Sequence, residues 1–198
     1  MNIIKHIRIY DMDDTLFFTP KPDVDDKGEK IFRLGINTKD GKEKKFLTNA
    51  EYETNKGEPW SFGGWWGRRE SLDLNTFDIK RNEYIYDEYI KDMNGVDKLM
   101  IMMTGRIKPL EGQVRQILDF HKMKFDRYYF NPGGISTLDY KIEVLDKYIS
   151  ENKHLETIKF YDDRDEHIPV FNSWAEKIMK ETGIDIEVVH VRGEGRVN

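Results

Sequence analysis

The sequence predicts an α/β fold built on a mostly parallel sheet. Short apolar runs are separated by segments in which apolar residues recur at helical spacing. The runs lie at residues 7–10, 99–103, 127–130, 158–161 and 186–191. Strands that alternate with helices of this length form parallel βαβ units, whose sheet is covered by helices on both faces.

Helices are expected between these strands, at residues 111–122, 141–152 and 170–182. Thr137 precedes the second of them as a possible N-cap, and Gly183 is expected to end the third. Apolar side chains in these segments repeat three and four residues apart, which is the spacing of one buried helix face.

Residues 21–77 interrupt this alternation. They begin with two predicted strands joined at Lys39-Asp40-Gly41, where Asp-Gly is a strong hairpin signal. A segment rich in tryptophan and glycine follows. We interpret 21–77 as a small cap inserted after the first strand, and assign residues 1–20 and 78–198 to the core. Residues 75–93 are expected to return the chain to the sheet as one or two helices.

The composition excludes several kinds of protein. A chain of 198 residues suits one well-packed domain with a modest insertion. Without cysteine there is no disulfide, thiolate zinc site or cysteine nucleophile. A net charge of −5 with interspersed signs argues against a broad basic surface, although it allows a local basic groove. The absence of any long apolar stretch predicts a cytoplasmic protein with no membrane association.

Reactive side chains follow four of the predicted strands. Ligand sites in open α/β sheets form outside the carboxyl ends of the strands, so these side chains are expected to meet. They are Asp11 and Asp13 after the first strand, Thr104-Gly105-Arg106 after the second, Lys141 beyond the third, and Asp162-Asp163-Arg164 after the fourth.

These residue types suit phosphoryl transfer. A carboxylate that attacks a phosphate dianion meets like-charge repulsion, so the site needs a bridging cation such as Mg²⁺, which prefers oxygen ligands. Asp11 together with Asp162 or Asp163 can supply the carboxylates, and the spacing does not choose between the last two. Lys141 is expected to neutralise a further charge, and Thr104 to donate its hydroxyl to the transferred phosphoryl group.

Asp13 is the expected acid–base group of this reaction. Its carboxyl group can protonate the leaving oxygen and later activate water against an aspartyl-phosphate on Asp11. The predicted activity is therefore hydrolysis of a phosphomonoester.

The sequence resembles the haloacid dehalogenase (HAD) superfamily over its whole core. The four motifs of the family are matched in order by Asp11-Met12-Asp13-Asp14-Thr15, Thr104, Lys141 and Asp162-Asp163. This resemblance implies a three-layer Rossmann-like core and Mg²⁺ held by Asp11, the Asp13 carbonyl and Asp162, with Asp163 acting through water or as an orienting group. A second aspartate at the Asp13 position implies a phosphohydrolase or phosphotransferase. The usual motif has Gly or Asn where Asp14 stands.

A finer likeness concerns the substrate. Residues 103–106 and 161–164 resemble motifs of the phosphatase domain in polynucleotide kinase-phosphatases. Residues 16–20, followed by 64–66, resemble the Swiss-army-knife RNA-repair-like branch of the superfamily. The likeness implies a nucleotidase or nucleic-acid repair activity, with a nucleotide or a nucleic-acid phosphate end as substrate.

Candidate substrate-binding residues each carry a structural alternative. Arg106 and Arg164 can grip phosphate in a bidentate manner or form salt bridges with the abundant acids. Trp65 and Trp66 can stack a nucleobase, but packing of the cap is the favoured interpretation. Gly105 is a substrate-binding candidate or only a turn residue.

Two rival functions stay open at the level of the sequence. One is a general phosphatase for small metabolites such as sugar phosphates, which the net acidity slightly favours. The other is a binding module that kept the fold and lost the activity. No obligate protein partner is evident, and His167 is interpreted as a structural helix residue.

Overall fold

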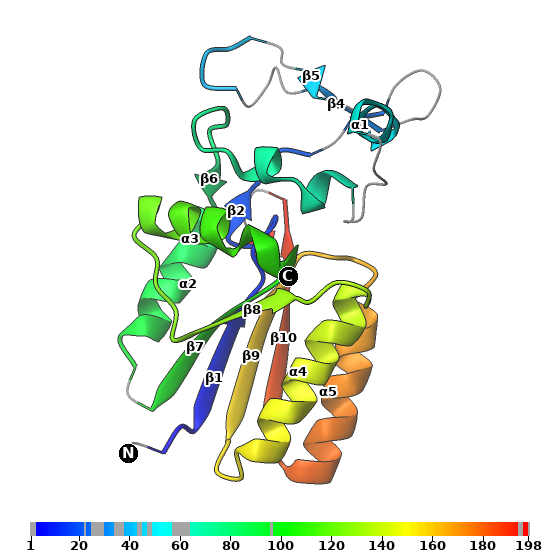
Figure 1. The fold of residues 1–198 in the computed structure, drawn as a ribbon. Coiled ribbons are helices and arrows are strands. Elements are labelled where there is room, and N and C mark those ends of the chain that lie inside the picture. The colour runs from blue at the N-terminus through cyan, green and yellow to red at the C-terminus, as the bar shows by residue number, and fades with distance from the viewer. Residues whose placement is uncertain are drawn as a thin grey trace. The chain divides into compact units, whose positions relative to one another are not determined.

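The computed structural model describes residues 3–21, 23–24, 30–33, 38–42, 45–46, 49–56, 64–95, 97–193 and 196–197. The chain divides into two compact units (Figure 1). Unit 1 comprises Met1–Phe18, Arg81–Gly105 and Lys124–Asn198, and unit 2 comprises Thr19–Lys80 and Arg106–Met123.

A six-stranded sheet forms the centre of unit 1, with the strand order β11-β10-β9-β1-β7-β8. Its strands are β1 (His6–Tyr10), β7 (Lys98–Ile107), β8 (Arg127–Asn131), β9 (Thr157–Asp162), β10 (Asp185–Arg192) and β11 (Arg196–Val197). β1 pairs in parallel with β7 and β9, and β9 pairs in parallel with β10, whereas β11 is antiparallel to β10. All five predicted strands are present, and the predicted α/β class is confirmed.

The helices of unit 1 are α2 (Glu83–Met93), α4 (Thr137–Glu151) and α5 (Ile168–Thr182). The predicted cap of α4 was wrong by one residue, because Ser136 has the extended backbone and accepts a hydrogen bond from the Asp139 N–H. Gly183 ends α5 in the left-handed conformation, as predicted. Residues 75–93, predicted to form one or two helices, contain the single helix α2, which begins after Asn82 because the Asn82 side chain accepts from the Ile85 N–H.

Alternating residues of the central strands separate the two faces of the sheet. Ile7 and Ile9 face an apolar core that includes Leu145 of α4 and Phe171 of α5. Tyr10 lies on the opposite face and donates a hydrogen bond to Asp92 of α2 at 2.7 Å. Unit 1 is therefore a three-layer sandwich, with α4 and α5 on one face and α2 on the other (Figure 1).

Unit 2 contains a small antiparallel sheet and several helices. Its elements are β3 (Asp23–Val24), β4 (Lys30–Arg33), β5 (Lys45–Phe46), α1 (Asn49–Lys56), the 3₁₀ helices η1 (Gly64–Gly67), η2 (Arg69–Leu72) and η3 (Lys108–Leu110), and α3 (Glu111–Phe120). β4 pairs antiparallel with β5, in agreement with the two strands expected there. β2 (Phe17–Phe18) and β6 (Lys80–Arg81) pair with each other, and each lies at a boundary along the sequence between the two units.

Buried side chains from both segments of unit 2 form its core. Trp65 packs edge-on against Phe77, with ring centroids 6.2 Å apart, and its indole N–H donates to the Pro20 carbonyl. α3 contributes a buried face of Val114, Ile117 and Leu118. Among the described residues of both units, no helix has the length and apolar character needed to cross a bilayer.

The chain turns tightly after β1. The N–H groups of Leu16 and Phe17 both donate to the Met12 carbonyl at 3.0 Å, and the Asp14 N–H donates to the Phe17 carbonyl at 2.8 Å. This turn gives Asp14 a φ of 54°. Left-handed backbone favours Gly and Asn and tolerates Asp, which explains why Gly or Asn is usual at this motif position.

Substitutions at Asp14 test this backbone constraint. Asp14→Gly is expected to leave the free energy of unfolding nearly unchanged, because glycine adopts positive φ without a clash. Asp14→Val is expected to lower it by about 1–2 kcal/mol, because the branched Cβ meets the backbone in this conformation. Urea denaturation in EDTA measures both effects, and equal stability of the two variants would contradict the prediction.

Candidate active site

The candidate site lies at the point where the strand order of the sheet reverses. The chain builds β7 and β8 on one side of β1 and then returns to build β9 and β10 on the other. Ligands bind parallel α/β sheets at such switch points. Asp11 follows β1 directly and Asp162 ends β9, and the Asp11 N–H donates to the Tyr161 carbonyl at 3.0 Å. This bond holds the two carboxylates at one edge of the sheet.

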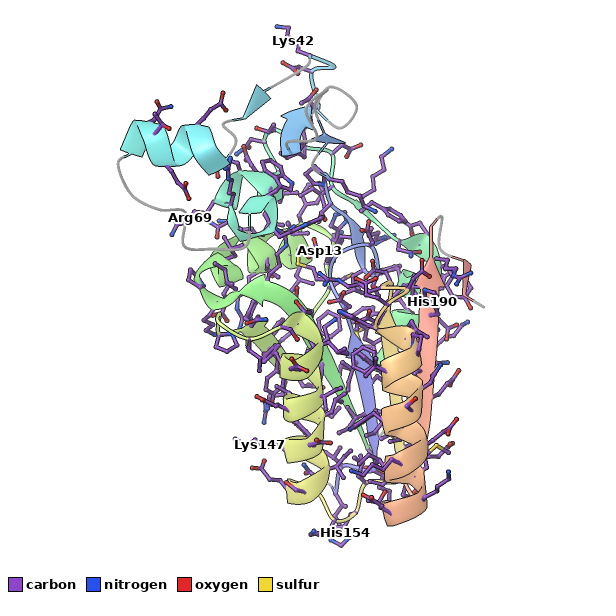
Figure 2. The ribbon with its side chains drawn as sticks, turned by 90° about the vertical axis from the view of Figure 1, so that its right-hand side faces the viewer. Asp13, Lys42, Arg69, Lys147, His154 and His190 are labelled. Atoms are coloured by element: carbon purple, nitrogen blue, oxygen red, sulfur yellow. The ribbon has the colours of Figure 1, made fainter. Side chains whose placement is uncertain are left out.

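Three carboxylates gather at this edge. One oxygen each from Asp11, Asp162 and Asp163 lies within 4.8 Å of the others. Asp11 and Asp162 are buried, and Asp163 is half-buried. The side chain of Asp13 is half-buried and is not among these three, whereas the resemblance assigned its backbone carbonyl to the metal. In Figure 2 Asp13 lies toward this end of unit 1, and His154 lies at the opposite end.

Lys141 joins two of the carboxylates. Its Nζ lies 2.9 Å from Oδ1 of Asp11 and 2.6 Å from Oδ2 of Asp162, and the side chain is fully buried. Of the other lysines considered from the sequence, Lys147 is exposed and Lys159 pairs with Glu187. The structure therefore brings only Lys141, of these three, to the acidic cluster.

The cluster carries more negative charge than Lys141 balances. Burial, reinforced by the neighbouring charge of Asp162 and opposed by Lys141, raises the pKa of Asp11 to about 6. Burial and the charges of Asp11 and Asp162 raise the pKa of Asp163 to about 8. Burial acts in the same direction on Asp162, but Lys141 and hydrogen bonds outweigh it and hold that pKa below its usual range. A divalent cation would relieve this crowding.

The donor set fits Mg²⁺. Its ligands in proteins are one or two carboxylates completed by water and phosphate oxygens, and three carboxylates here are within reach of one ion. Asp162 and Asp163 both belong to the set, so both alternatives predicted from the sequence lie at the site.

His167 is a residue that the sequence interpretation did not place in the site. It precedes α5, is buried, and its Nδ1 lies 3.7 Å from Oδ1 of Asp162. The Arg164 N–H donates to the same oxygen at 3.0 Å. The only sign of this role in the sequence is the short separation of His167 from Asp162 along the chain. A turn after Asp162 returns the chain toward that carboxylate. The His167 ring therefore lies beside the Asp162 carboxylate, and it also packs edge-on against the ring of Phe171.

Thr104 and Gly105 lie on β7 at the same edge. Met102 of β7 pairs with Tyr10, so the buried Thr104 lies one residue beyond the level at which Asp11 follows β1. A Cβ on Gly105 would lie 2.7 Å from Oγ1 and 2.8 Å from Cγ2 of Thr137. Gly105 therefore allows β7 to approach the first turn of α4, one helical turn before Lys141.

Arg106, Trp65 and Trp66 belong to unit 2, where contacts within the unit account for them. Arg106 is 2% exposed and donates to the Trp66 carbonyl at 2.6 Å and to Ser71 Oγ at 2.7 Å. Its guanidinium also lies over the Trp66 ring at 4.8 Å. Trp65 is 1% exposed, so its ring is buried and offers no face for stacking a base. Burial leaves Arg106 and Trp65 no surface for substrate, in agreement with the packing alternative, whereas Trp66 is half-buried and stays a candidate.

Arg164 keeps its place as a substrate-binding candidate. It is half-buried beside Asp162, and its guanidinium makes no hydrogen bond or ion pair to any other residue that the structure describes. Trp60, the remaining tryptophan of the predicted cap, lies outside the described residues.

Fold and site together define a Rossmann-like α/β protein with a carboxylate cluster at its switch point. Residues 52–197 match the HAD domain family 1 in Swiss Army Knife RNA repair proteins, and the chain belongs to this family. The matched region includes Thr104, Lys141 and Asp162 and begins after the turn that carries Asp11. The predicted HAD superfamily and RNA-repair-like branch are confirmed.

The chain is also similar to a solved structure described as the Pnkp1/Rnl/Hen1 RNA repair complex, with a TM-score of 0.50 and 11% sequence identity. The similarity covers 96% of this chain and 43% of the other, so this chain spans less than half the length of the one it matches. At this identity the likeness concerns the fold alone.

Replacing Lys141 tests the buried ion pairs. Lys141→Met removes the ammonium group that lies between two buried carboxylates, so the free energy of unfolding is expected to fall by about 3 kcal/mol. Urea denaturation at neutral pH without metal measures the change. Lys147→Met, on the exposed side of the same helix, is the matched control and should change stability little. Equal effects of the two substitutions would contradict the assignment.

A double-mutant cycle tests the contact between Gly105 and Thr137. Gly105→Ala is expected to cost about 1–3 kcal/mol, because the added Cβ overlaps a short branched side chain. Thr137→Ala removes the overlapping atoms, so Gly105→Ala should cost much less in that background. Strictly additive changes in the free energy of unfolding, measured by urea denaturation, would show that Thr137 does not restrict the size of the residue at position 105.

Neutralising Asp163 tests the excess charge. In EDTA, Asp163→Asn is expected to be at least as stable as the unmodified protein, because burial and the charges of Asp11 and Asp162 disfavour an ionised carboxylate at this position. Added Mg²⁺ should raise the Tm of the unmodified protein and raise that of the variant less. Differential scanning calorimetry with and without Mg²⁺ measures both, and a Tm insensitive to Mg²⁺ in the unmodified protein would argue against a metal site.

Proposed function

We propose that the chain is a Mg²⁺-dependent phosphatase that hydrolyses a phosphate monoester at a nucleic-acid end through an aspartyl-phosphate intermediate on Asp11. The observation that carries this proposal is the cluster of Asp11, Asp162 and Asp163 around the buried Lys141 at the switch point. Membership of a HAD domain family supports it.

Asp11 is the proposed nucleophile. Lys141 pairs with one of its oxygens and opposes the rise of its pKa, which favours the ionised form that attack on phosphorus requires. Attack forms a bond from a carboxylate oxygen of Asp11 to phosphorus and breaks the bond from phosphorus to the ester oxygen. Bound Mg²⁺ would supply charge neutralisation between the carboxylate and the phosphate.

Asp13 is the proposed acid and base. In the first step its proton passes to the leaving ester oxygen, which departs as an alcohol. In the second step Asp13 takes a proton from water, whose oxygen attacks phosphorus and releases phosphate and the free Asp11 carboxylate. Thr104 is proposed to donate its hydroxyl to a phosphoryl oxygen, and Arg164 to contact the same group.

The nucleic-acid substrate rests on the family, whose description refers to RNA repair proteins. The motif likeness around Thr104 and Asp162 points in the same direction. The net charge of −5 favours the sugar-phosphate alternative, so substrate comparison has to decide between them.

Phosphate release from a substrate panel tests the proposal. The panel holds 5′- and 3′-mononucleotides, a 3′-phosphorylated oligonucleotide, sugar phosphates and an aryl phosphate, each with Mg²⁺ and with EDTA. We expect the highest kcat/KM on a nucleotide or oligonucleotide, and loss of activity with EDTA. Asp11→Asn should lower kcat by about three orders of magnitude or more and leave the fold intact.

Three outcomes would contradict parts of this assignment. Near-normal turnover in Asp11→Asn would remove the nucleophile, as long as circular dichroism shows a folded protein. Preference for sugar phosphates would replace the substrate class. No release from any substrate, including the aryl phosphate, would favour a binding module without activity.

A further inference from the structure

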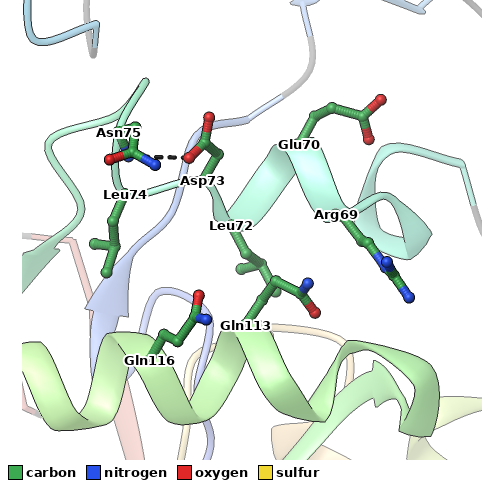
Figure 3. A pocket seen from close by; sticks show the side chains of 8 residues that line it. All are labelled: Arg69, Glu70, Leu72, Asp73, Leu74, Asn75, Gln113 and Gln116. Carbon is green, nitrogen blue, oxygen red and sulfur yellow. Dashed lines mark hydrogen bonds between the residues drawn. The ribbon is translucent and has the colours of Figure 1, made fainter.

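A cavity of about 310 Å³ lies within unit 2, between the η2 region and α3 (Figure 3). It is separate from the carboxylate cluster, which belongs to unit 1. Its lining residues are Arg69, Glu70, Leu72, Asp73, Leu74, Asn75, Gln113 and Gln116. The chain enters this part of unit 2 twice, so the cavity combines residues far apart in the sequence.

Amide groups make up half of the polar side chains that line the cavity. Gln113 and Gln116 are three residues apart on α3, and Figure 3 shows both pointing from that helix toward the segment that carries Leu72 and Leu74. Among the residues that the structure describes, neither glutamine side chain has a hydrogen-bond partner. Their donors and acceptors are therefore available to a ligand.

The side chain of Asp73, in contrast to the two glutamines, is hydrogen-bonded within the wall of the cavity. One of its carboxylate oxygens accepts from the Asn75 N–H at 3.0 Å, and the other accepts from the Thr76 hydroxyl at 2.6 Å. These bonds fix the turn that follows η2. The amide of Asn75 is thereby carried on a rigid segment opposite α3.

The charge of the lining disfavours a phosphate group as the occupant. Arg69 contributes one positive charge, and Glu70 and Asp73 contribute two negative charges, which leaves a net charge of −1. The half-buried Leu74 adds apolar surface between the polar groups, whereas Leu72 is 2% exposed. An uncharged ligand that has an apolar face to contact leucine and carries both donors and acceptors fits this lining.

We propose that this cavity binds one unpaired base of a single-stranded nucleic acid. The inference rests on the proposed function and names a second contact to the same class of substrate. An amide side chain presents a donor beside an acceptor, which complements the edge of a nucleobase. The volume lies at the lower end of the range for ligand sites, which suits a single nucleoside.

Binding of fluorescein-labelled single-stranded oligonucleotides, measured by anisotropy, tests the proposal without requiring turnover. Two strands are compared, one with all bases and one in which abasic sites replace them. The unmodified protein is expected to bind the first about tenfold more tightly. Gln113→Leu/Gln116→Leu is expected to reduce this ratio toward one, because leucine keeps the approximate size of glutamine and removes its hydrogen bonds.

Asp119→Leu is the matched control, because it places the same side chain at an exposed position of α3 outside the cavity. It should keep the ratio of the unmodified protein. An unchanged ratio in the double glutamine variant would overturn the proposal, and so would equal binding of both strands by the unmodified protein.

Hydrolysis of the aryl phosphate separates this inference from the proposed function. The double glutamine variant should keep the kcat of the unmodified protein on that substrate, while its KM for a phosphorylated oligonucleotide rises about tenfold. If the unmodified protein hydrolyses none of these esters, the proposed function fails, and the ratio of the two strands still decides whether the cavity binds a base.

Discussion

The buried ammonium of Lys141 between Asp11 and Asp162 is the interaction on which the site depends. The two carboxylates come from neighbouring strands, and the lysine comes from a helix that packs on one face of the sheet. A charge buried this deeply is stable only while its partners stay in place. The register of β1 and β9, the start of α4 and the geometry of the acidic cluster are therefore coupled through one side chain.

Stacked tyrosines support this arrangement from the opposite face. Tyr10 and Tyr161 immediately precede the two aspartates and stack at 4.6 Å, with their ring planes 10° apart. Asp92 accepts the Tyr10 hydroxyl and also pairs with Arg8 and Lys98. The strand ends are thus held by an apolar core on one side and by a hydrogen-bonded aromatic layer on the other. A rigid sheet of this kind suits a reaction that depends on the positions of charged groups.

The sequence predicted the strands well, because short apolar runs mark them, and the rule for parallel sheets predicted that Asp11, Thr104 and Asp162 lie at one edge without side-chain detail. Local packing was harder to predict. The sequence left both a substrate-binding and a packing interpretation open for Arg106 and Trp65, because their burial depends on contacts between segments far apart in the chain. His167 and the N-cap Ser136 depend on turn geometry, and the clash that excludes a side chain at Gly105 depends on the distance between β7 and α4. The tertiary contacts of Arg106, Trp65 and Gly105 have no signature in residue order.

The division of unit 2 into two segments limits how the chain can be dissected. Thr19–Lys80 supplies Trp65 and Leu72, whereas Arg106–Met123 supplies the buried face of α3. Excising only the first segment would leave Val114, Ile117 and Leu118 without that part of their core and expose an apolar helix to solvent. A minimal version of unit 1 therefore requires two deletions and two designed connections. A gene fusion or shuffling experiment that removes residues 21–77 as a self-contained module would leave α3 with an exposed apolar face, which promotes aggregation.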